Sequence, residues 1–273
     1  MSNGKIRYYF EFTIKLHIDH EPLLTAIKNT LDIGRIAVRP HNNNCTFEVG
    51  SEEELRILIN LFDKTTLMGA KYLDYISFRK AFFLYFDRSG LVTESLITEI
   101  EEIRGNHNTN RSEFKMPVEH NCIITDYKLL GLIEGDGSFM IQKKDLTPKF
   151  ELELTLAQKP LIVAIQSYLI SNLGLDESYQ LSGKLPKMKI RDLQGKSNSK
   201  PTVRLEITGV NFLHNYFNVF FNKFNFFSDK RKDFEDFCFI CKVLDRKAHI
   251  NNKQVKDVLL KLAEGMNSAR LST

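Results

Sequence analysis

Apolar and polar residues alternate in two stretches of the chain that match one another. Phe10–Leu16 and Phe150–Leu156 both alternate with a period of two, at an offset of 140 residues, and this period is typical of half-buried β-strands. A helical pattern follows each stretch, over Pro22–Ile27 and Pro160–Ile165. In both, the proline lies at the helix start, where its missing N–H group costs no helical hydrogen bond. The pattern therefore predicts a strand followed by a helix, twice.

The match continues along both halves, so the chain contains a structural repeat. Three further pairs of segments match, namely Phe47–Val49 with Leu205–Ile207, the amphipathic stretches Glu52–Phe62 with Asn211–Phe221, and Lys71–Phe78 with Lys230–Phe237. The last pair reads Lys-x-x-Asp-aromatic-x-x-Phe in both copies. Because the offset grows from 140 to 158, the second copy is predicted to contain a longer strand-loop-strand excursion. Each repeat thus reads strand, helix, two strands and two helices, which is a mixed α/β fold of the α+β type.

A polar stretch separates the two repeats. Gly105–Ser112 is rich in Asn, Thr and Ser, which is typical of a linker. We therefore predict a first repeat over residues 1–104, a linker over 105–122 and a second repeat over 123–273. A further amphipathic helix is predicted over Lys253–Gly265, with its apolar residues inward: Val255, Val258, Leu259 and Leu262. No apolar run approaches the roughly 20 residues that a membrane helix needs, so no membrane partner is expected.

Charge is distributed unevenly along the chain. Residues 121–273 hold 23 Lys and Arg against 17 Asp and Glu, whereas residues 1–120 hold 15 against 17. Seven basic residues and one acid, Asp192, lie between residues 184 and 204; the basic ones are Lys184, Lys187, Lys189, Arg191, Lys196, Lys200 and Arg204. Such a cluster favours a surface that follows nucleic-acid phosphates. A solvated charged face would explain the charge equally well.

The four cysteines are too few and too scattered for a disulfide framework. Cys238 and Cys241 form a C-x-x-C pair inside a helical pattern, but no second pair of Cys or His lies at zinc-ligand spacing. Core packing is therefore favoured over a zinc site.

One segment, Leu129–Phe139, carries candidate chemistry. It is apolar and helical in pattern up to Gly135, presents a carboxylate at Asp136 and breaks at Gly137. Gly131 and Gly135 lie four residues apart, so they leave one helix face without side chains and allow close helix approach. Asp136 at the helix end, with the adjacent carbonyl of Gly135, offers the oxygen ligands that hard divalent cations prefer.

Leu130–Gly137 resembles the signature of LAGLIDADG homing endonucleases and their maturase relatives, and the repeats extend the resemblance over nearly the whole chain. It implies two pseudo-symmetric repeats, each with a curved, four-stranded antiparallel saddle backed by helices. The motif helix, residues 125–137, would pack against a second such helix through Gly131 and Gly135. By resemblance, each helix brings one acid to a metal site beside the minor groove, while the saddles read the major groove. The implied function is site-specific, metal-dependent cleavage of double-stranded DNA by a monomer.

The resemblance also implies roles for individual residues. Asp136 and the carbonyl of Gly135 would bind a divalent metal, expected to be Mg²⁺. Lys230, with Lys71 as its counterpart, would lie near the scissile phosphate and offset its developing charge; a surface lysine at a helix start is the plain alternative. On the saddles, the residues expected to contact DNA are Arg35, Arg39, Lys143, Lys144, Lys184, Lys187, Lys189, Arg191, Lys196, Lys200 and Arg204.

The first repeat has no copy of the motif in this sequence. Subtracting 140 from Leu129–Phe139 places that copy at positions −11 to −1, ahead of Met1. Three interpretations stay open: an intron-encoded DNA endonuclease whose first motif helix lies upstream, a non-cleaving maturase that binds group I intron RNA, and a truncated inactive remnant. In each, the unpaired motif helix predicts self-association through its exposed seam.

The expected location is the mitochondrion, with the gene inside the organelle, and a chloroplast is the second choice. The residues support this weakly, because Trp is absent, Phe, Asn, Lys and Ile are abundant, and the N-terminus has no import presequence.

Overall fold

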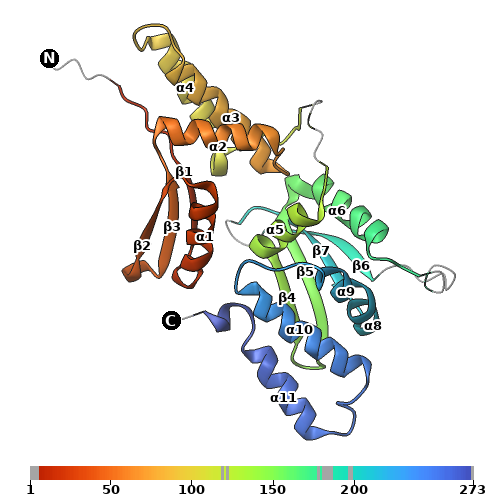
Figure 1. The fold of residues 1–273 in the computed structure, drawn as a ribbon. Helices are drawn as coiled ribbons and strands as arrows, with labels where there is room; N and C mark the ends of the chain where they lie inside the picture. Colours follow the sequence, from red (N-terminus) through yellow and green to blue (C-terminus); the bar gives the residue numbers. More distant parts are fainter. Residues whose placement is uncertain are drawn as a thin grey trace. The chain divides into compact units, whose positions relative to one another are not determined.

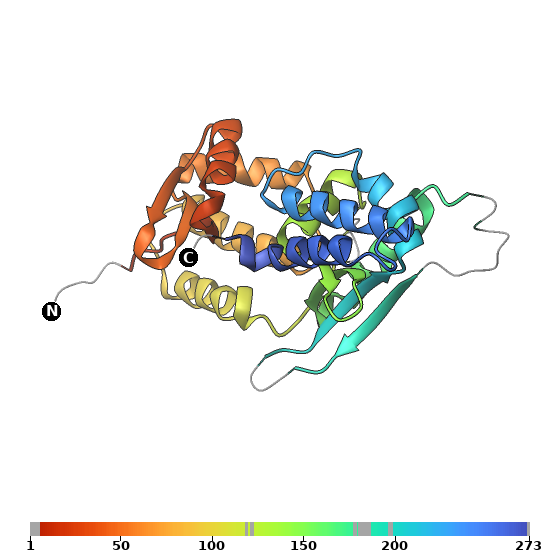
Figure 2. The ribbon, with the colours of Figure 1, turned by 90° about the horizontal axis from the view of Figure 1, so that it is seen from below.

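The structure is a computed structural model that describes residues 6–117, 120, 123–176, 179, 187–195 and 199–271. It divides into two compact units, Met1–Ile123 and Ile124–Thr273. Figure 1 shows the ribbon and Figure 2 the same ribbon from below. Lys184, Lys196 and Cys122 lie outside the described residues. No helix of the described part is both long and apolar enough to cross a membrane.

The first unit consists of an antiparallel sheet and four main helices. The sheet has the order β1-β3-β2, with β1 at Phe12–His17, β2 at Arg35–Arg39 and β3 at Asn44–Val49. The helices are α1 (Glu21–Leu31), α2 (Glu52–Lys64), α3 (Ala70–Phe86) and α4 (Glu94–Gly105). Alternate residues of β3, Cys45, Phe47 and Val49, are fully buried in a core with Leu55 and Phe82.

The second unit begins with a helix that runs directly into a strand (Figure 1). Its antiparallel sheet has the order β4-β5-β7-β6, with β4 at Gly137–Gln142, β5 at Thr147–Thr155, β6 at Met188–Leu193 and β7 at Thr202–Thr208. The helices are α5 (Asp126–Asp136), α6 (Lys159–Asn172), α8 (Val210–Phe212), α9 (Asn218–Phe221), α10 (Lys230–Asp245) and α11 (Lys253–Glu264). Helices α10 and α11 lie side by side in both views (Figures 1 and 2).

The predicted mixed α/β class with two antiparallel sheets is confirmed. The strand register also corrects one detail of the repeat. Phe12 lies opposite Val49 in the first sheet, and Phe150 lies opposite Ile207 in the second. Strand β1 therefore matches β5 at an offset of 138, not 140. A shift of two residues leaves every side chain on the same face, so the alternation of residues could not distinguish the two offsets.

Three other expectations differ from the structure. The first sheet has three strands among the described residues, where four were expected, and the missing one is the counterpart of β4. The predicted helix Asn211–Phe221 is interrupted by a π-helical turn at Leu213–Phe217. In α11, Val258 is 53% exposed and does not point inward, whereas Leu259 is buried.

The beginning of the predicted linker packs against helix α3 of the first unit. Asn108–Asn110 forms a short 3₁₀ helix, and the following Arg111 is buried. The guanidinium of Arg111 donates to the carboxylate of Asp74 at 2.9 Å, to the carbonyl of Leu73 and to the hydroxyl of Ser77. The polar composition of this segment suggested a linker. Composition alone does not reveal the buried ion pair between Arg111 and Asp74 that anchors the segment.

Candidate functional site

The candidate acid stands at the junction of α5 and β4. Helix α5 begins after Thr125, whose side chain accepts the N–H of Lys128 at 3.3 Å, as helix-capping residues do. Leu129, Leu130 and Ile133 anchor one face of the helix in the core. The helix ends at Asp136, whose side chain lies on the exposed face, and the next residue already belongs to β4. No loop residue separates the acid from the sheet.

Two features fix this junction. A side chain at Gly137 would meet the backbone oxygen of Ile133 at 2.7 Å, so only glycine allows the chain to turn this closely against the helix. Two residues later, Phe139 is fully buried and packs its ring against Phe150, Phe234 and Phe237 at centroid separations of 5.2–5.4 Å. The aromatic contacts anchor β4 and, through it, the end of α5.

Glu134 fixes the loop that precedes α10. Its two carboxylate oxygens accept the N–H groups of Phe227 at 2.5 Å and Ser228 at 2.8 Å. Glu134 thus contacts the backbone of this loop with both of its carboxylate oxygens. The loop therefore holds the first residue of α10, Lys230, close to the acid.

Lys230 is half-buried beside the junction. Its ammonium group donates to the carbonyl of Gly137. Burial lowers the pKa of Lys230, and the nearby carboxylates of Asp233, Asp136 and Glu134 partly offset this shift. The lysine and the acid that the sequence singled out are thus brought together in one electrostatic environment.

A buried clamp behind Lys230 was missed by the sequence analysis. Asp233, one helical turn after Lys230, is buried and accepts hydrogen bonds from the N–H of Asn267 at 3.0 Å and from the guanidinium of Arg270 at 2.9 Å. The side chain of Asn267 donates to the carbonyl of Phe139 at 2.9 Å. The clamp therefore connects α10, the chain after α11 and β4.

The first unit contains the same clamp. Asp74 accepts hydrogen bonds from the N–H of Asn108 and the guanidinium of Arg111, both at 2.9 Å. The pattern Asn-x-x-Arg at Asn108 and Asn267 is separated by 159 residues, as are Lys71 and Lys230. This shared offset was the signal in the sequence that would have revealed both clamps.

Lys71 differs from Lys230 in its surroundings, because it is exposed beside a groove of about 330 Å³ in the first unit. The residues that line this groove include Phe12, Phe62, Lys71, Tyr75, Phe78 and Asn108. By the offset of 159, Tyr75, Phe78 and Asn108 correspond to Phe234, Phe237 and Asn267, which contact β4 in the second unit. The groove in the first unit therefore corresponds to the surface against which β4 packs in the second unit.

The two predicted interface glycines both lie on the exposed face of α5. Apart from the adjacent residues and the helix's own backbone, no heavy atom of the described residues lies within 4 Å of the position that a Cβ would take at Gly131 or Gly135. Tyr127, one turn before Gly131, is 69% exposed on the same helix. The face that the sequence assigned to a second helix thus has room for one.

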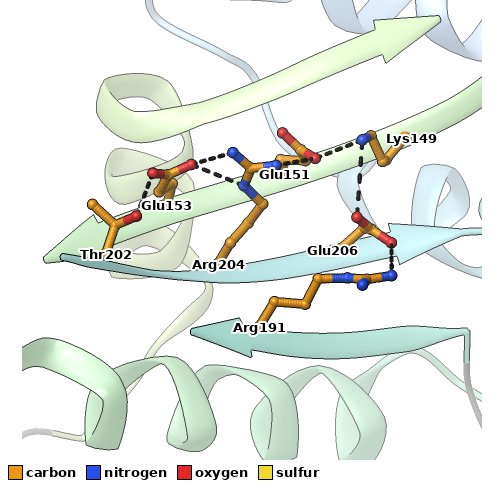
Figure 3. Close-up of polar contacts among 7 residues, drawn as sticks. All are labelled: Lys149, Glu151, Glu153, Arg191, Thr202, Arg204 and Glu206. Atoms are coloured by element: carbon orange, nitrogen blue, oxygen red, sulfur yellow. Dashed lines mark hydrogen bonds and ion pairs between the residues drawn. The ribbon is translucent and has the colours of Figure 1, made fainter. Parts of the chain in front are cut away.

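The sheet of the second unit carries charged side chains on the face opposite its core (Figure 3). Arg204 contacts Glu153 at 2.6 Å and Glu151 at 2.9 Å, and Arg191 lies 3.4 Å from Glu206. The sequence placed these arginines in a basic cluster with one acid. Glu151 and Glu153, the partners of Arg204, lie on β5 about 50 residues earlier, whereas Glu206, the partner of Arg191, lies on β7 just beyond the cluster.

The remaining basic residues are placed as follows. Arg35 and Arg39 lie on β2, both paired with Glu48. Lys143 and Lys144 lie in the exposed turn between β4 and β5. Lys187, Lys189 and Lys200 are exposed near or on β6 and just before β7. The described basic residues thus lie along the sheets and their connecting turns, where the sequence expected a nucleic-acid surface.

The described residues contain no group of three or more His, Cys, Asp or Glu side chains able to hold an ion. The carboxylate of Asp136 and the carbonyl of Gly135 are the kind of oxygen donors that suit a hard cation, and Mg²⁺ needs only one or two carboxylates beside water and phosphate oxygens.

Burial raises the pKa of the Cys238 thiol to about 12 and also raises that of Cys241, which agrees with core packing.

Solved structures share this fold. I-GzeII, a LAGLIDADG homing endonuclease solved in complex with its DNA target, is 22% identical; the match covers 99% of this chain and 92% of that one, with a TM-score of 0.80. The meganuclease I-CpaMI bound to uncleaved DNA is also 22% identical, with a TM-score of 0.77 over 98% of this chain and 93% of that one.

Curated relatives are similar in sequence. A probable intron-encoded endonuclease of Schizosaccharomyces pombe, Cox1-I1b, is 28% identical over 63% of this chain and 44% of its own length. Probable intron-encoded endonuclease 3 of Neurospora crassa is 24% identical over 94% of this chain and 48% of its own length. The chain thus spans about half the length of the curated relatives it matches. The profile of the LAGLIDADG endonuclease family matches residues 1–82 and 129–241, which is more than half of the sequence. The chain belongs to the LAGLIDADG endonuclease family.

Proposed function

We propose that this chain is an intron-encoded homing endonuclease that binds a double-stranded DNA site and hydrolyses its phosphodiester bonds with a divalent metal, Mg²⁺. The observation that carries the proposal is the junction of α5 and β4, where Asp136 and the half-buried Lys230 lie in one electrostatic environment. Support also comes from the family membership and from the names of the relatives.

Asp136 and the carbonyl of Gly135 would hold the metal, which when bound polarises the phosphate and lowers the pKa of water. Lys230 stands beside the acid with a positive charge that can offset negative charge on a phosphate oxygen. Burial strengthens this effect, because a partly desolvated charge is screened less than an exposed one. Gly137, Glu134 and the clamp of Asp233 hold Asp136 and Lys230 in fixed positions relative to one another.

We further propose that a full active site uses a second acid from a helix of the α5 type. Support comes from the groove beside Lys71, where Tyr75, Phe78 and Asn108 correspond to three residues that contact β4 in the second unit. A strand filling it would bring its preceding helix, and so a second carboxylate, to the first unit. The exposed face at Gly131 and Gly135 offers room for that helix.

The experiment is cleavage of a supercoiled plasmid that carries the intron-insertion site, with Mg²⁺. Two working acids give linear DNA, whereas Asp136 alone gives only nicked circles. Asp136→Asn is expected to reduce cleavage by at least about 100-fold, beyond the 10–100-fold typical of residues that only support a metal ligand. A plasmid untouched by the wild-type chain, or full cleavage by Asp136→Asn, would contradict the proposal.

The mitochondrion is the proposed location, with the reading frame inside an intron of an organellar gene. Support comes from the naming of both fungal relatives as intron-encoded endonucleases. Sequencing the DNA around the reading frame in the source organism tests this, because a nuclear locus without a surrounding intron would contradict it.

A further inference from the structure

Each sheet carries a shielded glutamate at the same position of its middle strand. Glu48 on β3 and Glu206 on β7 lie 158 residues apart, the offset that relates the two strands. Their strand neighbours, such as Phe47 and Leu205, are fully buried in the two cores, so the glutamates point to the opposite face. Their side chains are nevertheless only 8% and 14% exposed.

The glutamates are shielded by arginines from the adjacent edge strands. In the first unit, Arg35 and Arg39 of β2 reach the two oxygens of Glu48 at 2.9 and 3.2 Å. In the second, Arg191 of β6 lies 3.4 Å from Glu206. The arginine side chains are 77%, 53% and 52% exposed. Each carboxylate therefore lies beneath a guanidinium that stays at the surface with further N–H donors to offer.

The second sheet extends this arrangement (Figure 3). Glu151 lies directly opposite Glu206, a like-charge pair that destabilises a sheet unless cations bridge it. Lys149 bridges the two carboxylates at 2.7 and 3.8 Å, and Arg204 contacts Glu151 and Glu153.

The network is also balanced in charge, because the carboxylates of Glu151, Glu153 and Glu206 are paired with the basic residues Lys149, Arg191 and Arg204. The hydrogen bond from the Thr202 hydroxyl lowers the pKa of Glu153, and the guanidinium of Arg204 lowers it further. This carboxylate is therefore ionised at neutral pH. A balanced network is poorly suited to following phosphates, which are all negative and would be repelled by the carboxylates.

Base edges in the major groove are a better match for this chemistry. They present donors and acceptors side by side, and an arginine held in one orientation can donate two hydrogen bonds to O6 and N7 of guanine. We propose that Glu48 and Glu206 are positioning residues, which aim the arginines of the neighbouring edge strands at base edges and so set the sequence preference of binding. This inference rests on the proposed function, because it requires that the sheets bind DNA.

The test begins with a duplex that the wild-type chain selects from a randomised library. Dissociation constants are then measured at about 0.15 M salt for this duplex, for all its single base-pair substitutions and for a random-sequence duplex. In Glu48→Gln, discrimination at one or two base pairs is expected to fall by about 10-fold. Binding of the random duplex is expected to hold or tighten, because a negative charge near the phosphates is lost.

Glu102→Gln is the matched control, because it makes the same change in net charge on the exposed surface of α4. It is expected to leave discrimination unchanged. In addition, adding Glu48→Gln to a variant that already carries Arg35→Ala and Arg39→Ala should lose little more discrimination, since Glu48 acts through these two arginines. Equal weakening of all duplexes by Glu48→Gln, or unchanged discrimination, would overturn the inference. A wild-type chain that selects no duplex would instead contradict the proposed function itself.

Discussion

The two units share a clamp but differ in what it supports. In both, a buried aspartate one turn into a helix holds an arginine and a backbone N–H from the chain that follows the next helix. In the second unit, the asparagine of the clamp also holds the carbonyl of Phe139 on β4. In the first unit, the corresponding surface is a groove. Both units therefore contain the clamp, whereas among the described residues only the second unit has a strand that follows the acid and packs beside the clamp.

Truncating equivalent phenylalanines would test this difference most strongly. Phe237 is fully buried against Phe139, so Phe237→Ala is expected to destabilise the second unit by about 3–5 kcal/mol. Phe78 lines the groove and is partly exposed, so Phe78→Ala should cost the first unit clearly less. Hydrogen exchange followed by mass spectrometry reads the two units separately. Equal losses of stability would mean that the groove in the first unit is covered as fully as the surface under β4 in the second.

Breaking the two clamps should give unequal effects on activity and stability. Asp74→Ala leaves Arg111, which is 7% exposed, without its partner, and should cost about 3 kcal/mol. Asp233→Ala should cost less, because the side chain of Arg270 is 25% exposed and keeps Asp236 at 2.5 Å.

Cleavage activity should show the reverse order, because Asp233 supports Lys230 and β4. The measurements are denaturant unfolding and plasmid cleavage on the same preparations. A larger loss of cleavage in Asp74→Ala than in Asp233→Ala would contradict the supporting role of Asp233 for Lys230 and β4.

The smallest effect is a pH dependence of stability that comes from Lys230. Burial lowers its pKa in the folded chain, so the unfolded chain binds more protons between the lowered pKa and the unfolded value of about 10.4. The free energy of unfolding should therefore gain a rising contribution with pH in this alkaline window. In Lys230→Met this contribution should disappear, and in Lys71→Met, where the exposed side chain is replaced, it should persist. Denaturant unfolding at several pH values measures it.

The sequence predicted the repeat, the fold class and the position of the acid, because these depend on periodicity and on one local motif. Through the family resemblance it also predicted that Lys230 lies near the scissile phosphate, which stays a prediction; the structure places Lys230 within the electrostatic reach of Asp136. It missed contacts between residues far apart in the chain, such as Asp74 with Arg111 and Glu151 with Arg204. A linker and a basic cluster were inferred from local composition, whereas burial and pairing across strands decide what such residues do.

The direct connection of α5 to β4 has a thermodynamic consequence for the binding of a metal ion. A ligand carried on a flexible loop must be ordered when the ion arrives, which costs about 1–2 kcal/mol per immobilised residue. Asp136 has no such loop, because the helix ends at the acid and the strand begins at Gly137. The backbone that carries the carboxylate loses its conformational freedom when the protein folds. Ion binding at this carboxylate should therefore involve little backbone ordering, so that affinity is governed by charge and hydration.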